Sequence, residues 1–127
     1  MSSSRDSRPA GTDPESCVAA QYREGDAYVV VLRGSVDLDG AEPVREALEA
    51  AAASGSECVI ADLSAMTFGD STMLNLLLRA HSTCSLRIAG PGEAVSRLFQ
   101  LTSTDTVLDI YPTLKAALAG GNRPADA

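Results

Sequence analysis

The order of apolar and polar residues predicts a hairpin near the start of the chain. Residues 27–33 (AYVVVLR) are rich in β-branched side chains, which is typical of a strand, and residues 18–23 (VAAQYR) form a weaker run of the same kind. Only residues 24–26 separate the two runs. A connection this short predicts that the two strands pair in antiparallel fashion.

Helical and extended patterns alternate along the rest of the chain. Residues 41–53 carry apolar side chains at helical spacing, whereas residues 58–63 (CVIADL) form a continuous apolar run, as expected of a strand buried on both faces. The same patterns predict, in chain order, a loop at 64–69, a helix at 70–80, a strand at 86–89, a helix at 93–101, a strand at 107–111 and a helix at 112–118.

This order of elements predicts an α/β fold with one mixed sheet. Strands separated by helices need crossover connections, which make the later strands parallel. We therefore expect an antiparallel amino-terminal hairpin, then parallel strands, with about four helices packed on the sheet. The 127 residues suit one domain at residues 16–119, and the segments 1–15 and 120–127, rich in small and polar residues, are expected to be flexible tails.

The charge balance argues against a nucleic-acid or membrane-surface partner. Ten Lys and Arg residues stand against 17 Asp and Glu residues, for a net charge of −7, and no basic patch is visible. No apolar run approaches the ~20 residues of a membrane helix, and none near the start predicts a secretory signal. Cys17, Cys58 and Cys84 are widely spaced, which favours reduced thiols over a disulfide framework or a zinc site. We expect a cytoplasmic protein.

Residues 59–78 (VIADLSAMTFGDSTMLNLLL) combine a strand end, a loop and a helix start. In open α/β sheets, the loops that follow the strands are where ligands and partners bind. Asp70 or Ser71 can cap the helix by accepting a hydrogen bond from its first turn. Taken alone, the Asp-Ser-Thr run at 70–72 needs no role beyond that cap.

Four short motifs, taken in order, resemble a known family. Gly-Ser-Val-Asp (34–37) follows a strand, Asp-Leu-Ser (62–64) ends another, Phe-Gly-Asp-Ser (68–71) precedes a helix, and the run at 110–118 joins the last strand to the last helix. Over residues 17–119 the sequence therefore resembles the STAS domain. This is the fold of bacterial anti-sigma factor antagonists and of the cytoplasmic domains of sulfate transporters.

The resemblance implies a protein switch with Ser71 as its regulated residue. Antagonists of this family bind an anti-sigma factor and so release a sigma factor, as in a bacterial stress response. That partner is a serine kinase with a histidine-kinase-like ATPase fold, and it switches the antagonist off by phosphorylating the first Ser of an Asp-Ser-Ser-Gly run. The acceptor maps onto Ser71, preceded by Asp70. The nucleotide belongs to the partner, so the resemblance implies no catalysis, no cofactor and no metal in this chain.

Two positions beside the acceptor depart from the family pattern. Thr72 replaces the second Ser, and Met73 replaces the Gly, which places a long side chain in the first helical turn where it is expected to affect partner fit. Partner contacts are expected at seven residues: Asp37, Asp39, Phe68, Asp70, Thr72, Met73 and Leu76.

The neighbouring positions have structural alternatives. Asp39, followed by Gly, also fits an ordinary turn. Asp62 either supports the Ser71 loop or caps local backbone. Of Met66 and Phe68, we expect one in the core and one facing a partner. Helical spacing assigns Leu74, Leu77 and Leu78 to the core. Candidates for the exposed side are Met73, Asn75 and Leu76, although a helix this apolar can also be buried on more than one face.

Three other interpretations stay open. A receiver domain would use Asp62 as phosphoacceptor, Asp37 and Asp39 as metal ligands and Lys115 as charge partner, but the short hairpin and the place of Lys115 within the last helix argue against it. A serine hydrolase needs Gly-x-Ser-x-Gly, which the sequence around Ser71 does not supply. The third keeps the STAS fold without phosphorylation, as a docking module of a transporter or signalling assembly.

Overall fold

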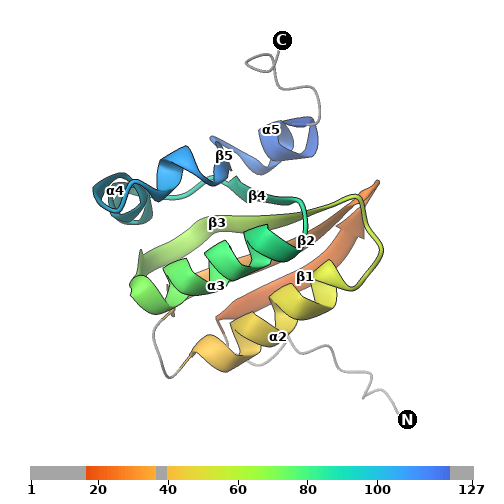
Figure 1. Ribbon diagram of the computed structural model, residues 1–127, viewed down its shortest axis with the longest axis horizontal. Coiled ribbons are helices and arrows are strands. Elements are labelled where there is room, and N and C mark those ends of the chain that lie inside the picture. The colour runs from red at the N-terminus through yellow and green to blue at the C-terminus, as the bar shows by residue number, and fades with distance from the viewer. Residues whose placement is uncertain (1–16, 37–39, 121–127) are drawn as a thin grey trace.

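The computed structural model, which describes residues 17–36 and 40–120, is a sheet with helices packed on it (Figure 1). The strands and helices alternate after an initial hairpin, as the sequence predicts. They are β1 (Val18–Glu24), β2 (Ala27–Val36), α2 (Ala41–Ala52), β3 (Cys58–Gly69), α3 (Ser71–Thr83), β4 (Leu86–Ala89), α4 (Glu93–Leu101), the short 3-10 helix η2 (Thr104–Thr106), β5 (Asp109–Tyr111) and α5 (Leu114–Leu118).

The five strands lie in the sheet in chain order, β1-β2-β3-β4-β5. β1 pairs antiparallel with β2 across a turn at Gly25, whose φ of 62° is easily adopted by glycine. The β2–β3, β3–β4 and β4–β5 pairs are parallel, each joined by a helical crossover. The predicted mixed sheet, with an antiparallel amino-terminal hairpin followed by parallel strands, is therefore confirmed.

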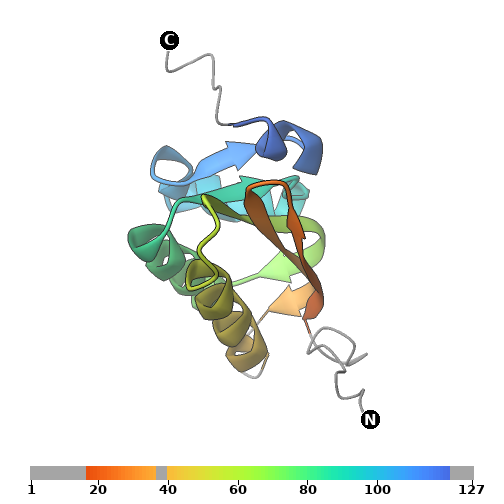
Figure 2. The same cartoon turned by 90° about the vertical axis from the view of Figure 1, so that its right-hand side faces the viewer.

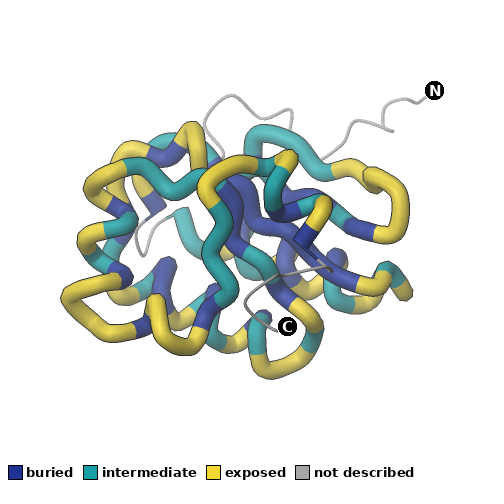
Figure 3. The backbone as a smooth tube through the Cα atoms, turned by 90° about the horizontal axis from the view of Figure 1, so that it is seen from above, coloured by how far each residue is buried: buried dark blue, intermediate teal, exposed yellow. Residues whose placement is uncertain are grey.

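Helices α2 and α3 pack side by side on one face of the sheet (Figures 1 and 2). Alternate strand residues such as Val30, Leu32 and Leu63 meet the apolar sides of these helices, among them Val44 and Leu77, to form the main core. Figure 3 shows that buried residues concentrate in the strands crossing the middle of the molecule, with exposed residues around them.

A smaller apolar cluster lies apart from the main core, between the sheet and α5. Val29 and Ile60 meet Ala117 of α5 there, with Leu114 and Leu118 packed against them. Helix α4 packs against β3, so that the carboxyl end of β3 lies between α3 and α4 (Figure 1). In the described parts of the chain, no helix combines the length and the apolar composition needed to cross a bilayer.

The predicted loop at residues 64–69 is wrong, because β3 continues through this segment to Gly69. Its carboxyl half pairs with β2 only, since the pairing of β3 with β4 ends at Asp62. The ladder with β2 shifts register twice, between Val31 and Arg33 and between Gly34 and Ser35, and at each shift β3 contains one more residue than β2. These bulges interrupt the two-residue alternation by which a strand is recognised in a sequence.

Candidate functional site

The pairing of β2 with β3 brings two of the sequence motifs together. Ser35 lies opposite Phe68, and Val36 lies opposite Gly69, at the carboxyl ends of the two strands. Gly34, which precedes them, has a φ of 68°, a left-handed conformation that favours glycine. The Gly-x-x-Asp motif therefore ends beside the Phe-Gly-Asp-Ser motif, although the last residue of the first motif, Asp37, lies outside the described residues, as does Asp39.

Asp70 and Ser71 have different roles at the start of α3. Asp70 is the N-cap, and its carboxylate accepts a hydrogen bond from the Thr72 backbone N–H at 2.9 Å. Ser71, the first helical residue, is exposed, and its hydroxyl has no hydrogen-bond partner among the described residues. Since Asp70 supplies the cap, the Ser71 hydroxyl is not needed for it and stays accessible for chemistry.

An open groove of about 670 Å³ runs from Ser71 to α4. Its apolar surface includes Phe68, which is 54% exposed, and Leu101, which is 77% exposed. Exposed side chains of this size, gathered beside one another, are typical of a surface that binds another protein. The groove is completed by Gly69, Asp70, Glu93, Ala94, Arg97 and Leu98.

The α4 side of this groove is absent from the predicted contact set. Val95 and Phe99 of α4 point into the core, whereas Leu98 and Leu101 line the groove. The sequence contains a signal for this side of the groove. Leu98 and Leu101 stand three residues apart on a helix whose core-facing side is formed by Val95 and Phe99. A second apolar pair on an amphipathic helix predicts a second surface to cover.

Met73 was expected on the exposed side of α3, and this expectation is wrong. Its side chain is 0% exposed and belongs to the main core. The thioether lies over Gly69: a Cβ at that position would be 2.6 Å from Sδ and 2.7 Å from Cε of Met73. The absence of a side chain at Gly69 thus makes room for Met73. The Met that stands where the family pattern has Gly is therefore accommodated inside the protein and not beside the Ser71 hydroxyl.

The remaining predicted contacts lie at the end of β3 and along α3, and they differ in exposure. Phe68 is exposed and Met66 is buried, which settles which of the two faces outward. Thr72 is half-buried and is held by its N–H bond to Asp70. Leu76 is also half-buried, but it lies on the side of α3 that faces α2 and does not line the groove.

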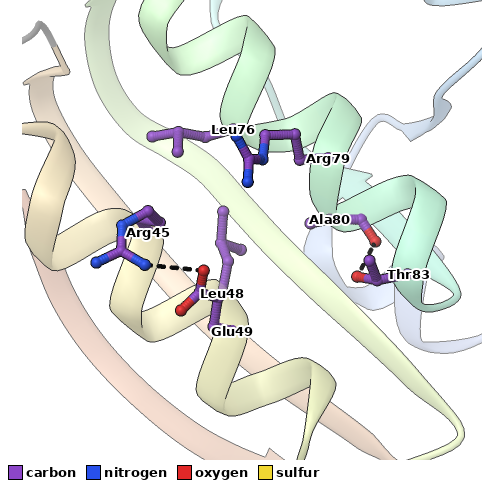
Figure 4. A pocket seen from close by; sticks show the side chains of 7 residues that line it. All are labelled: Arg45, Leu48, Glu49, Leu76, Arg79, Ala80 and Thr83. Atoms are coloured by element: carbon purple, nitrogen blue, oxygen red, sulfur yellow. Dashed lines mark hydrogen bonds and ion pairs between the residues drawn. The ribbon is translucent and has the colours of Figure 1, made fainter.

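Leu76 lines a second hollow, the seam between α2 and α3 (Figure 4). Leu48 and Leu76 project into the space between the two helices. Arg45 forms ion pairs within α2, with Glu42 and, at 2.8 Å, with Glu49. The seam encloses about 100 Å³, much less than the groove. Arg45 already pairs with Glu42 and Glu49 of its own helix, and the leucines fill the space between the helices, so the seam serves the packing of α2 and α3.

Asp62 has a local structural role. Asp62 is 8% exposed, and its carboxylate accepts hydrogen bonds from the Ser64 N–H at 3.0 Å and the Ser64 hydroxyl at 2.7 Å. A receiver domain needs an accessible acceptor carboxylate in a parallel sheet, whereas this one is buried and the first strand is antiparallel. The receiver interpretation is therefore overturned. Within the described residues, no three His, Cys, Asp or Glu side chains gather in a way that would hold a metal ion.

Comparison with known proteins agrees with this architecture. A crystal structure of an anti-sigma factor antagonist from Mycobacterium paratuberculosis is 27% identical, with a TM-score of 0.75 over 80% of this chain and 90% of that one. Unphosphorylated SpoIIAA, at 20% identity, superposes with a TM-score of 0.62 over 78% of this chain and 91% of its own. Phosphorylated SpoIIAA from Bacillus, at 18% identity, gives 0.60 over 79% and 96%.

These SpoIIAA structures show a shared fold, and the sequence identifies the family. No significant match arises among curated proteins. The family described as "Mlab, STAS domain" matches residues 19–112, which is most of the chain. The protein therefore belongs to the STAS domain family.

Proposed function

We propose that this protein is an anti-sigma factor antagonist that binds its partner through the groove between β3, α3 and α4 and is switched off by phosphorylation of Ser71. The observation that carries the proposal is the accessible Ser71 hydroxyl at the rim of an apolar groove, with the capping role taken by Asp70. The partner is an anti-sigma factor with serine kinase activity and a histidine-kinase-like ATPase fold. The chain itself acts by binding and not by catalysis.

Phosphorylation at this position changes binding without a need to unfold the domain. A phosphoserine carries about −1.5 to −2 charges at neutral pH. The amino terminus of a helix tolerates an anion because its N–H groups and dipole are oriented toward it. In a complex, the same charge meets a surface that fits a neutral hydroxyl. One like-charge contact at 4 Å costs about 4 kcal/mol at an effective dielectric of 20, and about 1.4 kcal/mol is already tenfold in affinity.

The comparisons support this assignment of role. A structural relative at 27% identity is an anti-sigma factor antagonist, and it aligns with 80% of this chain. SpoIIAA, a protein of the same fold, has been seen in both unphosphorylated and phosphorylated forms. A phosphate on this fold is therefore compatible with a folded domain.

The test is affinity capture from the native cytoplasm, read by mass spectrometry. The baits are the wild type, Ser71→Ala, Ser71→Glu and, as a control, Ser82→Glu, which adds the same charge at an exposed position near the other end of α3. We expect every bait except Ser71→Glu to recover a small ATPase-like kinase, and that kinase with ATP to add about 80 Da to the wild type but not to Ser71→Ala.

Two results would count against the switch. If Ser71→Glu and the authentic phosphoprotein each recovered as much kinase as the unphosphorylated wild type, charge at Ser71 would not control binding. Recovery of an unrelated protein by all four baits would instead favour the docking-module alternative, with Ser71 serving as an ordinary first residue of the helix.

A further inference from the structure

Arg97 of α4 lines the same groove as Ser71, and its present ion pair is weak. Its guanidinium lies 3.8 Å from the Glu93 carboxylate, and the two side chains are 68% and 90% exposed. An exposed pair at this distance contributes little and is screened by salt. Glu93 is the first residue of α4, where the helix dipole favours a carboxylate without any partner. Arg97 can therefore leave Glu93 at little cost.

The charges around the groove leave a phosphate at Ser71 in need of a cation. The described residues that line it include two carboxylates, Asp70 and Glu93, and a single basic side chain, Arg97. Asp70 cannot turn away freely, because its carboxylate holds the cap of α3. A phosphate added beside Asp70 would raise the negative charge of a surface that is already net negative. The guanidinium fork of Arg97 suits phosphate oxygens, which it can bind through two parallel hydrogen bonds.

We propose that phosphorylation transfers Arg97 from Glu93 to the phosphate on Ser71, and that this pairing closes the groove. The inference rests on the proposed phosphorylation of Ser71. With its guanidinium on the phosphate, the Arg97 side chain spans from α4 to the start of α3, over the apolar surface that includes Phe68 and Leu98. The off state then has two parts: a charge that repels the partner, and a side chain that covers the surface where the partner docks.

The experiment is a phosphorus-31 NMR titration of protein made with phosphoserine incorporated at position 71. Arg97→Gln is the test variant, and Arg79→Gln is the matched control, because Arg79 is an exposed arginine of α3 that lines the seam with α2 and not the groove. The second pKa of phosphoserine lies near 6. We expect Arg97→Gln to raise this pKa by roughly 0.2 to 0.7 units relative to wild type, as the loss of an exposed ion pair predicts, and Arg79→Gln to leave it in place.

A second readout follows the guanidinium itself. The Arg97 Nε–Hε resonance, assigned by its disappearance in Arg97→Gln, should shift and exchange more slowly with water when Ser71 carries phosphate. Equal phosphate pKa values in Arg97→Gln and Arg79→Gln, or an Arg97 resonance unchanged by phosphorylation, would overturn the pairing.

The outcomes separate this inference from the proposed function. If phosphoserine abolishes kinase recovery while Arg97→Gln leaves the phosphate pKa unchanged, the switch stands and the pairing fails. If the pKa moves as expected but the phosphoprotein still recovers the kinase, the pairing stands and the switch fails.

Discussion

The contact between Met73 and Gly69 can be tested by a double-mutant cycle. The thioether of Met73 fills the space where a Cβ of residue 69 would stand, at 2.6 to 2.7 Å from its terminal atoms, and its side chain is fully buried. Met73→Ala empties that space, Gly69→Ala overfills it, and the double variant adds a methyl group at residue 69 while removing the thioether that it would meet. The same two positions therefore report both a cavity and an overpacking.

The expected magnitudes follow from burial and from the clash. Met73→Ala removes a fully buried side chain and should lower the free energy of unfolding by about 2 to 5 kcal/mol. Gly69→Ala forces the flexible end of Met73 aside, which should cost about 1 to 3 kcal/mol. In the double variant the added methyl group has no thioether to meet. Its destabilisation should fall below the sum of the two single effects by about 1 to 2 kcal/mol.

The assay is urea unfolding at equilibrium, with the midpoint and the slope recorded for each variant. Met73→Leu keeps the buried volume and should cost less than about 1.5 kcal/mol. A control cycle pairs Met73→Ala with Gly55→Ala, where an added Cβ meets nothing within 4 Å and the penalty comes only from the φ of 84°. That cycle should be additive within about 0.5 kcal/mol.

Additivity of Gly69→Ala with Met73→Ala, to the same precision as the control cycle, would refute the packing argument. So would a loss below about 1 kcal/mol for Met73→Ala, which is too small for a fully buried methionine. A Met73 single variant that stays folded should still capture the proposed partner as wild type does, because Met73 is not exposed.

Three further predictions concern single sites. Asp70→Ala should lower the free energy of unfolding by about 0.5 to 2 kcal/mol because the Thr72 N–H loses its acceptor, and Asp70→Ser should restore most of it; equal urea midpoints for the two variants would count against the cap. Ser103→Gly should raise the free energy of unfolding by up to about 1 kcal/mol, since Ser103 holds a φ of 61°, and an unchanged or lower urea midpoint would contradict this. Burial raises the pKa of the Cys58 and Cys84 thiols, so at pH 8 they should react with a disulfide reagent more slowly than in unfolded protein, and faster as the pH rises; equal rates would exclude the burial argument.

The sequence predicts the sheet more completely than the site. The β-branched run of β2 and the apolar run that opens β3 are strong local signals, and the crossovers between strands leave few possible topologies. The continuation of β3 to Gly69 was not predictable from alternation, because its pairing with β2 shifts register twice. Such shifts depend on the partner strand and leave no regular pattern in the strand itself.

The position of Met73 shows where residue spacing and family pattern disagree. Met73, Leu77 and Ala80 stand at i, i+4 and i+7, which places all three on one buried face of α3. The family pattern has Gly at the first of these positions, and a Gly gives no information about what its surroundings can hold. The free volume over Gly69 is a tertiary feature, so the sequence alone does not reveal that a Met fits there.

The different positions of Ser71 and Met73 explain how the family motif can change while the proposed switch is retained. Asp70 and Ser71 present their polar groups at the rim of the groove, whereas Met73, two residues on, points into the core. A substitution at residue 73 therefore acts on the free energy of unfolding, whereas a charge at residue 71 changes the surface that the proposed partner would contact. If the groove is the docking surface, partner choice depends on Phe68 and on the apolar pair of α4, and not on the residue that departs most from the family pattern.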